Sequence, residues 1–341
     1  MAIKSSNTQI ADERPVSPKE QASEGNYQYS LRPKNLTEYI GQEHIKKHLA
    51  VAIESAKIRD TALEHILFYG PPGLGKTTLS TLIANEMGSA IKSTSGPAIE
   101  KQSDLVSILT SMLEGEILFI DEIHRLKPQI EEILYSAMED FQIDIMVGSG
   151  TGATSIKMDI PKFTLIGATT RLSSLSHPLR DRFGNVLKLD FYTQDELAHI
   201  IERSFEILEM EKLPSAVIDS IAKRSRGTPR IANRYVKIIR DYATVGKKIQ
   251  CEADCKKIFD NFGVDEYGLD RLDQILLSHL SQSGINTPLG LSTLASLIGE
   301  EVSTIEDVVE PYLLQIGLIE RSPRGRKITM KGKEYIKNKN K

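Results

Sequence analysis

The stretch GPPGLGKTT, residues 70–78, decides the fold. A short apolar run ending in glycine, HILFYG, precedes it, and a helical pattern, TTLSTLIANEM, follows it. A strand, a glycine-rich turn and a helix in this order are the context that a phosphate-binding P-loop requires. The glycines let backbone N–H groups surround phosphates, Lys76 adds a positive charge, and Thr77 is placed to ligate Mg²⁺. A chance glycine turn is the alternative, and the flanking strand and helix argue against it.

A second motif, ILFIDE, ends at residue 122 and complements the first. Its four apolar residues predict a buried strand, and Asp121 follows at the carboxyl end, where α/β sheets bind ligands. We expect Asp121 to hold Mg²⁺ and Glu122 to polarise an attacking water. An Asp-Glu pair that caps a helix is the alternative, but the P-loop upstream favours the catalytic interpretation. A carboxylate such as Glu122 that can accept a proton from water also favours hydrolysis of the nucleotide over nucleotide binding alone.

Further polar side chains follow along the chain. Thr170 ends the apolar run FTLIGATT and lies level with Asp121 if the two strands are neighbours. HPLRDRFG then carries Arg180 and Arg182, and RGTPRIANR carries Arg230 at the start of a helix. An arginine directed at a γ-phosphate stabilises charge in the transition state. Taken one at a time, each of these arginines is more typical of a surface or salt-bridging residue, and spacing alone does not choose among them.

The composition indicates an ordinary globular protein. The chain has 341 residues, of which 40% are hydrophobic and 26% charged, enough for two or three domains with cores of their own. No apolar run approaches the roughly 18 residues of a membrane-spanning helix, and the N-terminus lacks an apolar signal sequence. The two cysteines, Cys251 and Cys255, are more typical of ordinary helical side chains than of a disulfide or zinc site. We therefore expect a reducing, cytoplasmic compartment.

Four segments of different character follow one another. Residues 1–26 are polar and aperiodic, which predicts a disordered N-terminal arm. Residues 27–192 alternate strand-like and helix-like runs, as in a parallel sheet covered by helices, so the fold class is α/β. Residues 193–263 show helical patterns alone, which predicts a small helical domain. Residues 264–341 give three short helices and then two brief strands, the pattern of a winged helix.

The charge is concentrated at the C-terminal end. Residues 321–341 carry nine Lys or Arg against one acid, a local net of +8, so that the remainder of a chain of total charge −3 carries −11. The arginines of RSPRGR fall at the predicted wing, where a projecting turn suits duplex phosphates. An acidic body with a basic end indicates a localised contact with a polyanion. We interpret the lysines of residues 331–341 as a solvated tail.

A β-hairpin is predicted at about residues 142–160. Two runs with alternating apolar residues flank GSGTG, which is typical of a hairpin turn. Ile143, Ile145, Met146 and Val147 would crowd a two-stranded projection that cannot bury them internally, which favours a contact surface for a partner. A hairpin folded back against its own domain is the alternative.

The order of the motifs indicates a family. GPPGLGKTT, FIDEIHRL, IGATTR, PLRDRFG and RGTPRIANR follow one another, with RPKNLTEYIGQE before them and PYLLQIGLIERSPRGR after them. From about residue 29 to 330 the chain resembles the RuvB family of AAA+ ATPases, the motors of Holliday-junction branch migration. The resemblance implies an AAA+ P-loop ATPase core with a helical lid domain and a C-terminal winged-helix domain. Local departures lie in the N-terminal arm, in RLSSLSH and in the helices before Arg230.

The resemblance also assigns roles to matching positions. It implies catalytic roles for Lys76, Glu122, the sensor residue Thr170 and the arginine finger Arg182, which acts on a neighbouring subunit. The implied nucleotide-binding residues are Leu31, Arg32, Gly73, Lys76, Thr77, Thr78, Glu139, Asp140, Phe141, Tyr192 and the second sensor, Arg230. Thr77 and Asp121 would hold the metal, and Arg321 and Arg326 would contact DNA.

The same resemblance implies ATP as substrate, Mg²⁺ as cofactor and a homohexamer on the double-stranded DNA of Holliday junctions. It implies RuvA as a partner at the hairpin, RuvC as a further partner, and no membrane. Two other functions stay open: a DNA-loading ATPase in which ATP drives assembly, and a protein-remodelling ATPase whose wing binds an acidic partner. A winged helix directly after the lid favours the motor, and stimulation of ATP hydrolysis by a four-way junction would separate it from both.

Overall fold

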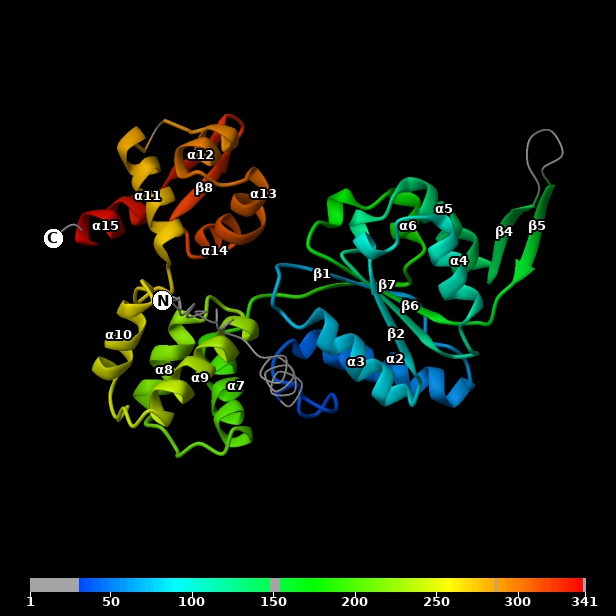
Figure 1. The fold of residues 1–341 in the computed structure, drawn as a ribbon, viewed down its shortest axis with the longest axis horizontal. Coiled ribbons are helices and arrows are strands. Elements are labelled where there is room, and N and C mark those ends of the chain that lie inside the picture. Colours follow the sequence, from blue (N-terminus) through cyan, green and yellow to red (C-terminus); the bar gives the residue numbers. More distant parts are fainter. Residues whose placement is uncertain (1–30, 148–153, 286, 340–341) are drawn as a thin grey trace, which may run out of the picture.

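The computed structural model describes residues 31–147, 154–285 and 287–339, so the predicted N-terminal arm lies outside it. Within these residues the chain forms three consecutive bodies (Figure 1). The first is an α/β body, the second a bundle of helices, and the third a small body of helices with a two-stranded sheet. No helix in this described part of the chain has the length and apolar character needed to cross a bilayer.

A parallel sheet forms the centre of the α/β body. Its strands are β1 (Ile66–Tyr69), β2 (Ile91–Ser95), β3 (Ile117–Asp121), β6 (Thr164–Thr169) and β7 (Asn185–Lys188), in the order β2-β3-β6-β1-β7. β6 lies between β3 and β1 and runs parallel to both, which confirms that the strands leading to Asp121 and Thr170 are neighbours. The carboxyl ends of β1, β3 and β6 therefore meet at one edge of the sheet, and the P-loop follows the first of them.

Helices cover both faces of this sheet. α2 (Glu43–Arg59) and α3 (Lys76–Met87) share one core with it, and α4 (Gln102–Thr110), α5 (Pro128–Glu139) and α6 (His177–Asp181) share another. Successive residues of β1 point to opposite faces: Ile66 and Phe68 belong to the first core and Leu67 to the second. This two-residue repeat, apolar on both faces, is the pattern of a fully buried strand.

A hairpin of β4 (Gln142–Val147) and β5 (Thr154–Asp159) projects from the α/β body (Figure 1), as expected from the sequence. The expectation for Ile143 is wrong, because the start of β4 packs against α5 and buries this side chain completely. The side chains of Ile145, Met146 and Val147 lie outside the described part of the hairpin.

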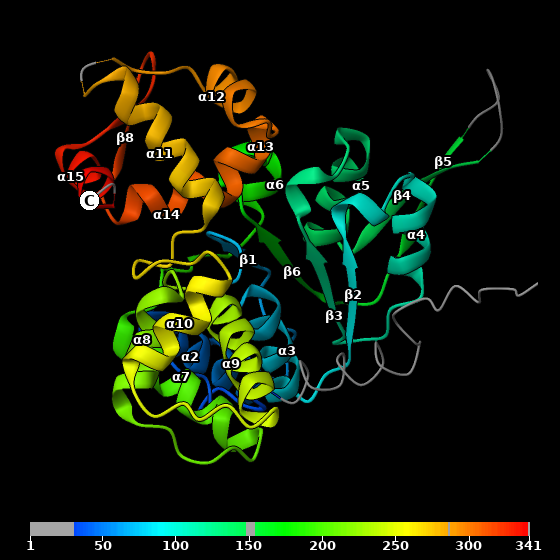
Figure 2. The ribbon, with the colours of Figure 1, turned by 60° about the vertical axis from the view of Figure 1, so that its left-hand side comes forward.

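The helical bundle consists of α7 (Gln194–Ile207), α8 (Ser215–Arg224), α9 (Pro229–Thr244) and α10 (Glu252–Asn261). A capping box fixes its start: the Thr193 hydroxyl accepts a hydrogen bond from the Glu196 N–H, and the Glu196 carboxylate accepts one from the Thr193 N–H. Tyr235 and Phe259 meet edge to face inside the bundle, with ring centroids 4.8 Å apart. Figure 2 shows the bundle on the side of the α/β body that carries α2 and α3, and the apolar side chains of the bundle belong to the same core as those of these two helices.

The third body is a winged helix. It contains α11 (Arg271–Ser283), α12 (Leu291–Ile298), α13 (Val302–Thr304), the π-helical turn η5 (Ile305–Val309), α14 (Glu310–Gln315), and the wing formed by β8 (Ile319–Ser322) and β9 (Gly325–Ile328). Leucines from its helices and Ile328 from the wing form a separate hydrophobic core. The predicted fold class, an α/β body followed by a helical body and a winged helix, is therefore confirmed.

The C-terminal lysines belong to a helix, and the prediction of a solvated tail is wrong for residues 331–339. α15 (Met330–Lys339) packs against α11 and β9. Tyr335 and Ile336 are partly buried against the winged-helix core, and the Tyr335 hydroxyl donates a hydrogen bond to Asp265. The two apolar side chains anchor the segment and leave its lysines at the surface. Residues 340 and 341 lie outside the described part of the chain.

Candidate functional site

A cavity of about 750 Å³ opens at the carboxyl edge of the sheet, between the α/β body and the helical bundle. Many of the predicted nucleotide residues line it: Leu31, Arg32, Gly73, Lys76, Thr77, Thr78, Asp121, Glu122, Thr170 and Arg230. They come together because three neighbouring strands end at this edge and the bundle covers it.

The P-loop needs glycine for both its backbone path and its close contacts. Gly73 and Gly75 have φ values of 83° and 98°, in the region that other residues rarely adopt. A Cβ atom at Gly75 would lie 2.8 Å from the Tyr39 hydroxyl oxygen, and one at Gly73 would lie 3.1 Å from Cβ of Arg230. Glycine at position 75 therefore lets the loop pack against Tyr39, and glycine at position 73 lets it pack against Arg230 of the bundle.

Lys76 places a buried cation in the cavity. Its ammonium group donates hydrogen bonds to the carbonyl oxygens of Gly70 (2.7 Å) and Pro71 (2.8 Å). Burial lowers the pKa of Lys76 to about 8, the charge of Asp121 opposes this shift, and the charge of Arg230 adds to it. A bound anion would favour the charged form of the lysine, so the cavity is electrostatically matched to phosphate.

Asp121 and Glu122 enter the cavity from the end of β3. The Glu122 N–H donates a hydrogen bond to Oδ1 of Asp121 (2.9 Å), and Glu122 itself has a φ of 48°. A left-handed conformation at a residue other than glycine is typical of functional sites. Oε2 of Glu122 lies 3.0 Å from Nη1 of Arg125, and the glutamate side chain is 46% exposed. This carboxylate is accessible to water at the edge of the cavity, where Thr170 follows the neighbouring strand.

The bundle contributes one face of α9 to the cavity. Besides Arg230, the lining includes Asn233, Arg234 and Lys237, and Ser95 joins them from the end of β2. The sequence prediction missed these four residues. Positions 230, 233, 234 and 237 have the spacing of a single helix face, so a polar and basic stripe after RGTP was the available signal.

Tyr192 is absent from the described lining of the cavity, although it was predicted to contact adenine. Its side chain is buried, and its hydroxyl donates to the Tyr39 hydroxyl (2.7 Å) and lies 3.3 Å from the Leu74 carbonyl oxygen. Burial raises the pKa of Tyr192 to about 12. The geometry places Tyr192 beneath the P-loop, and a contact with adenine stays a prediction.

Arg182 and Glu139 form a separate group at the end of α5, and neither belongs to the described lining of the cavity. Arg182 donates from Nη1 to the Pro178 carbonyl oxygen (2.8 Å) and from Nη2 to Oε2 of Glu139 (3.0 Å). Its guanidinium lies over the Tyr135 ring, 4.7 Å from the centroid. Asp140 and Phe141 follow directly on Glu139. An arginine held away from its own cavity is suited to the predicted action on a neighbouring subunit.

The wing arginines are paired with an acid. Arg321 and Arg326 lie opposite each other in the β8–β9 register, and both contact the fully buried Glu310. Nε of Arg321 is 2.5 Å from Oε1 of Glu310, and Nη2 of Arg326 is 2.9 Å from Oε2. The Arg321 side chain is 60% exposed and that of Arg326 only 16%. Arg324, in the turn between the strands, is also exposed.

The residues of the cavity fit a magnesium–nucleotide complex. Thr77 and Asp121 bring oxygen ligands into the same cavity as Lys76 and the start of α3. Magnesium in nucleotide sites is commonly held by one or two protein oxygens together with substrate phosphates. The cavity volume of about 750 Å³ also falls within the range of small-molecule sites, roughly 300–1,000 Å³.

Family comparisons match all three bodies. The family described as the Holliday junction DNA helicase RuvB P-loop domain matches residues 31–189. The RuvB AAA lid domain matches residues 192–265, and the RuvB C-terminal winged helix domain matches residues 266–337. The three matches follow the α/β body, the helical bundle and the winged helix in order.

Solved structures of Thermotoga maritima RuvB are similar over nearly their whole length. One, described as a Holliday junction branch migration motor, is 48% identical with a TM-score of 0.82, and the match covers 90% of this chain and 98% of that one. A single-residue variant of the same protein is 49% identical with a TM-score of 0.83 and the same coverage. With its P-loop cavity, helical lid and winged helix, this chain belongs to the RuvB family of AAA+ ATPases.

Proposed function

We propose that this protein is an ATP-driven motor that translocates double-stranded DNA and so drives branch migration of Holliday junctions in recombination and repair. The observation that carries the proposal is the cavity itself, where Lys76, Asp121 and Glu122 of the α/β body face Arg230 of the lid. Chemistry at a boundary between two bodies can change their relative position. The winged helix follows the lid directly, so such a change would reach a DNA-binding surface.

The residues of the cavity divide the work of ATP hydrolysis. Lys76 neutralises charge on the β- and γ-phosphates, and Glu122 accepts the proton of the attacking water. Thr170 lies at the end of the neighbouring strand, where it can position that water. Thr77 and Asp121 would hold Mg²⁺, which supplies further neutralisation of the phosphate oxygens when bound. Arg230 brings the charge of the lid to the γ-phosphate end.

The proposed assembly is a homohexamer with ATP sites between subunits. Arg182 supports it, because it lies outside the cavity of its own chain and is held by Glu139 and Tyr135 on another surface. The stretch from Glu139 to Phe141 shares that surface and would border the neighbour's nucleotide. RuvA would bind the projecting hairpin, duplex DNA would contact Arg321 and Arg326, and RuvC would join the assembly at the junction. We place this assembly in the cytoplasm.

The decisive experiment measures ATP hydrolysis with and without a four-way DNA junction, in the presence and absence of RuvA. We expect stimulation by the junction that RuvA increases, whereas stimulation by a sliding clamp or by protein alone would contradict a motor. Lys76→Ala should abolish hydrolysis in every condition. Glu122→Gln should retain ATP binding and hydrolyse about 100-fold or more slowly, because only the base for water is lost.

Mixing two inactive variants tests the shared sites. Lys76→Ala and Arg182→Ala subunits, mixed in one oligomer, should regain part of the activity. A mixed interface unites an intact P-loop from one subunit with an intact arginine from the other. Verified mixed oligomers without any recovery would place Arg182 in the site of its own chain.

A further inference from the structure

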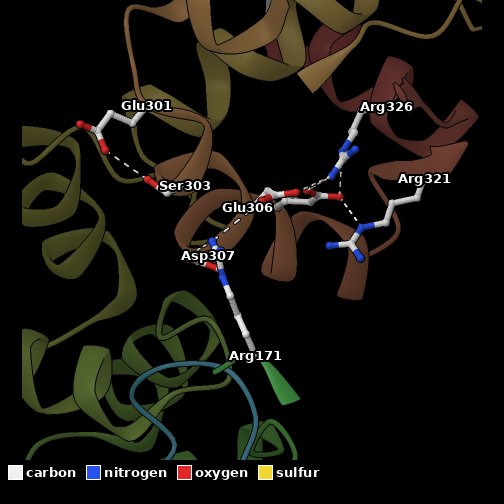
Figure 3. Close-up of polar contacts among 8 residues, drawn as sticks. Arg171, Glu301, Ser303, Glu306, Asp307, Arg321 and Arg326 are labelled. Carbon is white, nitrogen blue, oxygen red and sulfur yellow. Dashed lines mark hydrogen bonds and ion pairs between the residues drawn. The ribbon is translucent and has the colours of Figure 1, made fainter. Parts of the chain in front are cut away.

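A short acidic segment of the winged helix lies between Arg171 of the α/β body and the arginines of the wing (Figure 3). Glu306 and Asp307 belong to η5, and Glu310 begins α14. We call these three residues the acidic turn. A π-helical turn within a helix is rare and is frequently found at functional sites. One side of the acidic turn contacts the α/β body, and the other contacts the wing.

The first contact is a two-point ion pair with the α/β body. Arg171 donates from Nε to Oδ1 of Asp307 (2.9 Å) and from Nη2 to Oδ2 (2.6 Å). Nη2 of Arg171 also lies 3.8 Å from Oε2 of Glu306. Both partners of the main pair have side chains that are 36% exposed, so water and ions can reach it. A bidentate arginine–carboxylate pair fixes orientation better than a single contact does.

Arg171 is tied to the nucleotide cavity through its neighbours. It directly follows Thr170, which lines the cavity. Its N–H donates a hydrogen bond to Oγ1 of Thr169 (3.0 Å), and the same oxygen lies 2.9 Å from Nδ1 of His124. His124 comes two residues after Glu122. A movement of Glu122 or Thr170 when nucleotide binds would therefore be transmitted to Arg171 through only a few covalent and hydrogen bonds.

The second contact of the acidic turn is with the wing. Oε1 of Glu306 lies 3.4 Å from Nη2 of Arg326, and the same nitrogen lies 2.9 Å from Oε2 of Glu310. Glu310 also holds Arg321. Glu306 is therefore within reach of arginines from both bodies, Arg171 on one side and Arg326 on the other (Figure 3).

We propose that Glu306 and Asp307 are positioning residues that couple the nucleotide cavity to DNA on the wing, an inference that rests on the proposed function. A duplex phosphate at Arg326 competes with Glu306 for the guanidinium. The Glu306 carboxylate, once released from Arg326, then pairs more strongly with Arg171. This stronger pair fixes the position of Thr170, which directly precedes Arg171 at the end of the strand. By thermodynamic linkage, nucleotide must change the affinity for DNA by the same factor as DNA changes the affinity for nucleotide.

The test measures this factor in both directions on the full chain. Duplex affinity is measured by fluorescence anisotropy with and without a non-hydrolysable ATP analogue, and analogue affinity is measured with and without duplex. We expect the two ratios to agree in the wild-type protein and to be at least about fivefold, the lower range of ordinary allosteric coupling. Asp307→Asn and Glu306→Gln should each bring both ratios about two- to fivefold closer to one, the effect of an accessible ion pair.

Glu301→Gln is the matched control. It removes one negative charge from the same segment of the winged helix, but Glu301 contacts Ser303 and has no described contact with Arg171 or the wing (Figure 3). Any general gain in DNA affinity from a lost negative charge appears in both nucleotide states and cancels in the ratio. The control should therefore keep the wild-type ratio.

A double-mutant cycle identifies the path. Arg171→Gln should lower the ratio as Asp307→Asn does, and the double variant should lower it no further, because both cut the same contact. Additive losses, an unchanged ratio in Asp307→Asn, or a wild-type ratio of one would overturn the coupling while leaving ATP hydrolysis and DNA binding intact. A wild-type protein that binds no duplex would instead overturn the proposed function, and the coupling with it.

Discussion

The winged helix is joined to the rest of the molecule in two contrasting ways. Its joint with the lid is buried: Nη2 of Arg226 lies 2.5 Å from Oδ2 of Asp273, and the two side chains are 9% and 1% exposed. Its joint with the α/β body is the pair of Arg171 and Asp307, each 36% exposed. A buried pair is costly to break, whereas an accessible pair exchanges readily with water. The lid therefore holds the winged helix firmly, whereas the contact of the winged helix with the α/β body is releasable.

Further contacts strengthen the lid joint. The Arg226 guanidinium also lies over the Tyr312 ring, 4.9 Å from the centroid. At Gly268, in the linker between the two bodies, φ is 76° and a Cβ atom would lie 2.2 Å from the Arg224 carbonyl oxygen. Burial raises the pKa of Asp273 to about 7, although the charge of Arg226 opposes this shift. Close packing at this joint leaves little room for relative movement of lid and winged helix.

The largest effect should come from Arg226→Ala, which breaks the buried joint. Removing one partner of a buried ion pair costs about 3–5 kcal/mol of unfolding free energy, because the remaining charge is left without compensation. The unpaired Asp273 can take up a proton, so the loss should be smaller at pH 5 than at pH 8. Denaturant unfolding at the two pH values measures both effects.

Arg226→Met combined with Asp273→Asn serves as its control, since neither new side chain is charged and Asn can still accept the cap hydrogen bond from the Asp270 N–H. We expect the double variant to recover at least half of the loss. Equal stability of wild type and Arg226→Ala would show that the lid joint is no firmer than the other.

The next largest effect is expected for Gly268→Ala. The left-handed backbone and the contact with the Arg224 carbonyl oxygen should together cost about 3 kcal/mol. Gly246→Ala offers a matched control, because its φ is similarly 79° but nothing lies within 4 Å of the added Cβ. A thermal shift that is the same for both variants would remove the close contact from the explanation.

A smaller effect is expected for Arg326→Ala in the wing. The buried Glu310 keeps Arg321 as a partner, so the loss of stability should be about 2 kcal/mol. The slope of log affinity for duplex against log salt should also become shallower by about 0.9 for one lost phosphate contact. Lys339→Ala, on the exposed side of α15, should change neither quantity. An unaltered slope in Arg326→Ala would show that this arginine serves only its contacts with Glu306 and Glu310.

The smallest effect on stability should come from Asp307→Asn, at the accessible joint. We expect less than about 1 kcal/mol, because a partly exposed ion pair contributes little to folding. The same variant should still lower the nucleotide–DNA coupling ratio. Coupling should therefore change while stability stays nearly the same. If Asp307→Asn lost as much unfolding free energy as Arg226→Ala, the two joints would be equally strong. The contact of Arg171 with Asp307 would then not be releasable.

The sequence predicted one side of the cavity better than the other. Lys76 and Asp121 belong to local motifs whose chemistry depends on a few adjacent residues. Asn233 and Lys237 were missed because their orientation depends on which face of α9 is buried, and Tyr235 and neighbouring apolar residues decide that face within the lid. The sequence shows that these polar residues share one face of the helix, but it does not show that this face borders the cavity.

Contacts between bodies were beyond the reach of local patterns. Arg171 and Asp307 are 136 residues apart, and nothing in either segment indicates that they meet. The wing arginines show the same limit. The turn was recognised from RSPRGR, but nothing in the sequence around Glu310 indicates that this residue is their buried partner. The segment of α15 was misjudged for a related reason: its many lysines obscured the two side chains that anchor it.

The packing of α15 has a consequence for the synthesis of the protein. Tyr335 reaches back to Asp265, and its ring lies 5.7 Å from that of Tyr267, so the last helix of the winged helix closes on the residues that precede its first. Domains form in order as a chain leaves the ribosome, beginning at the N-terminus. The α/β body can therefore acquire its core while later residues are still being synthesised, whereas the winged helix can be completed only when the residues of α15 are available to pack against it.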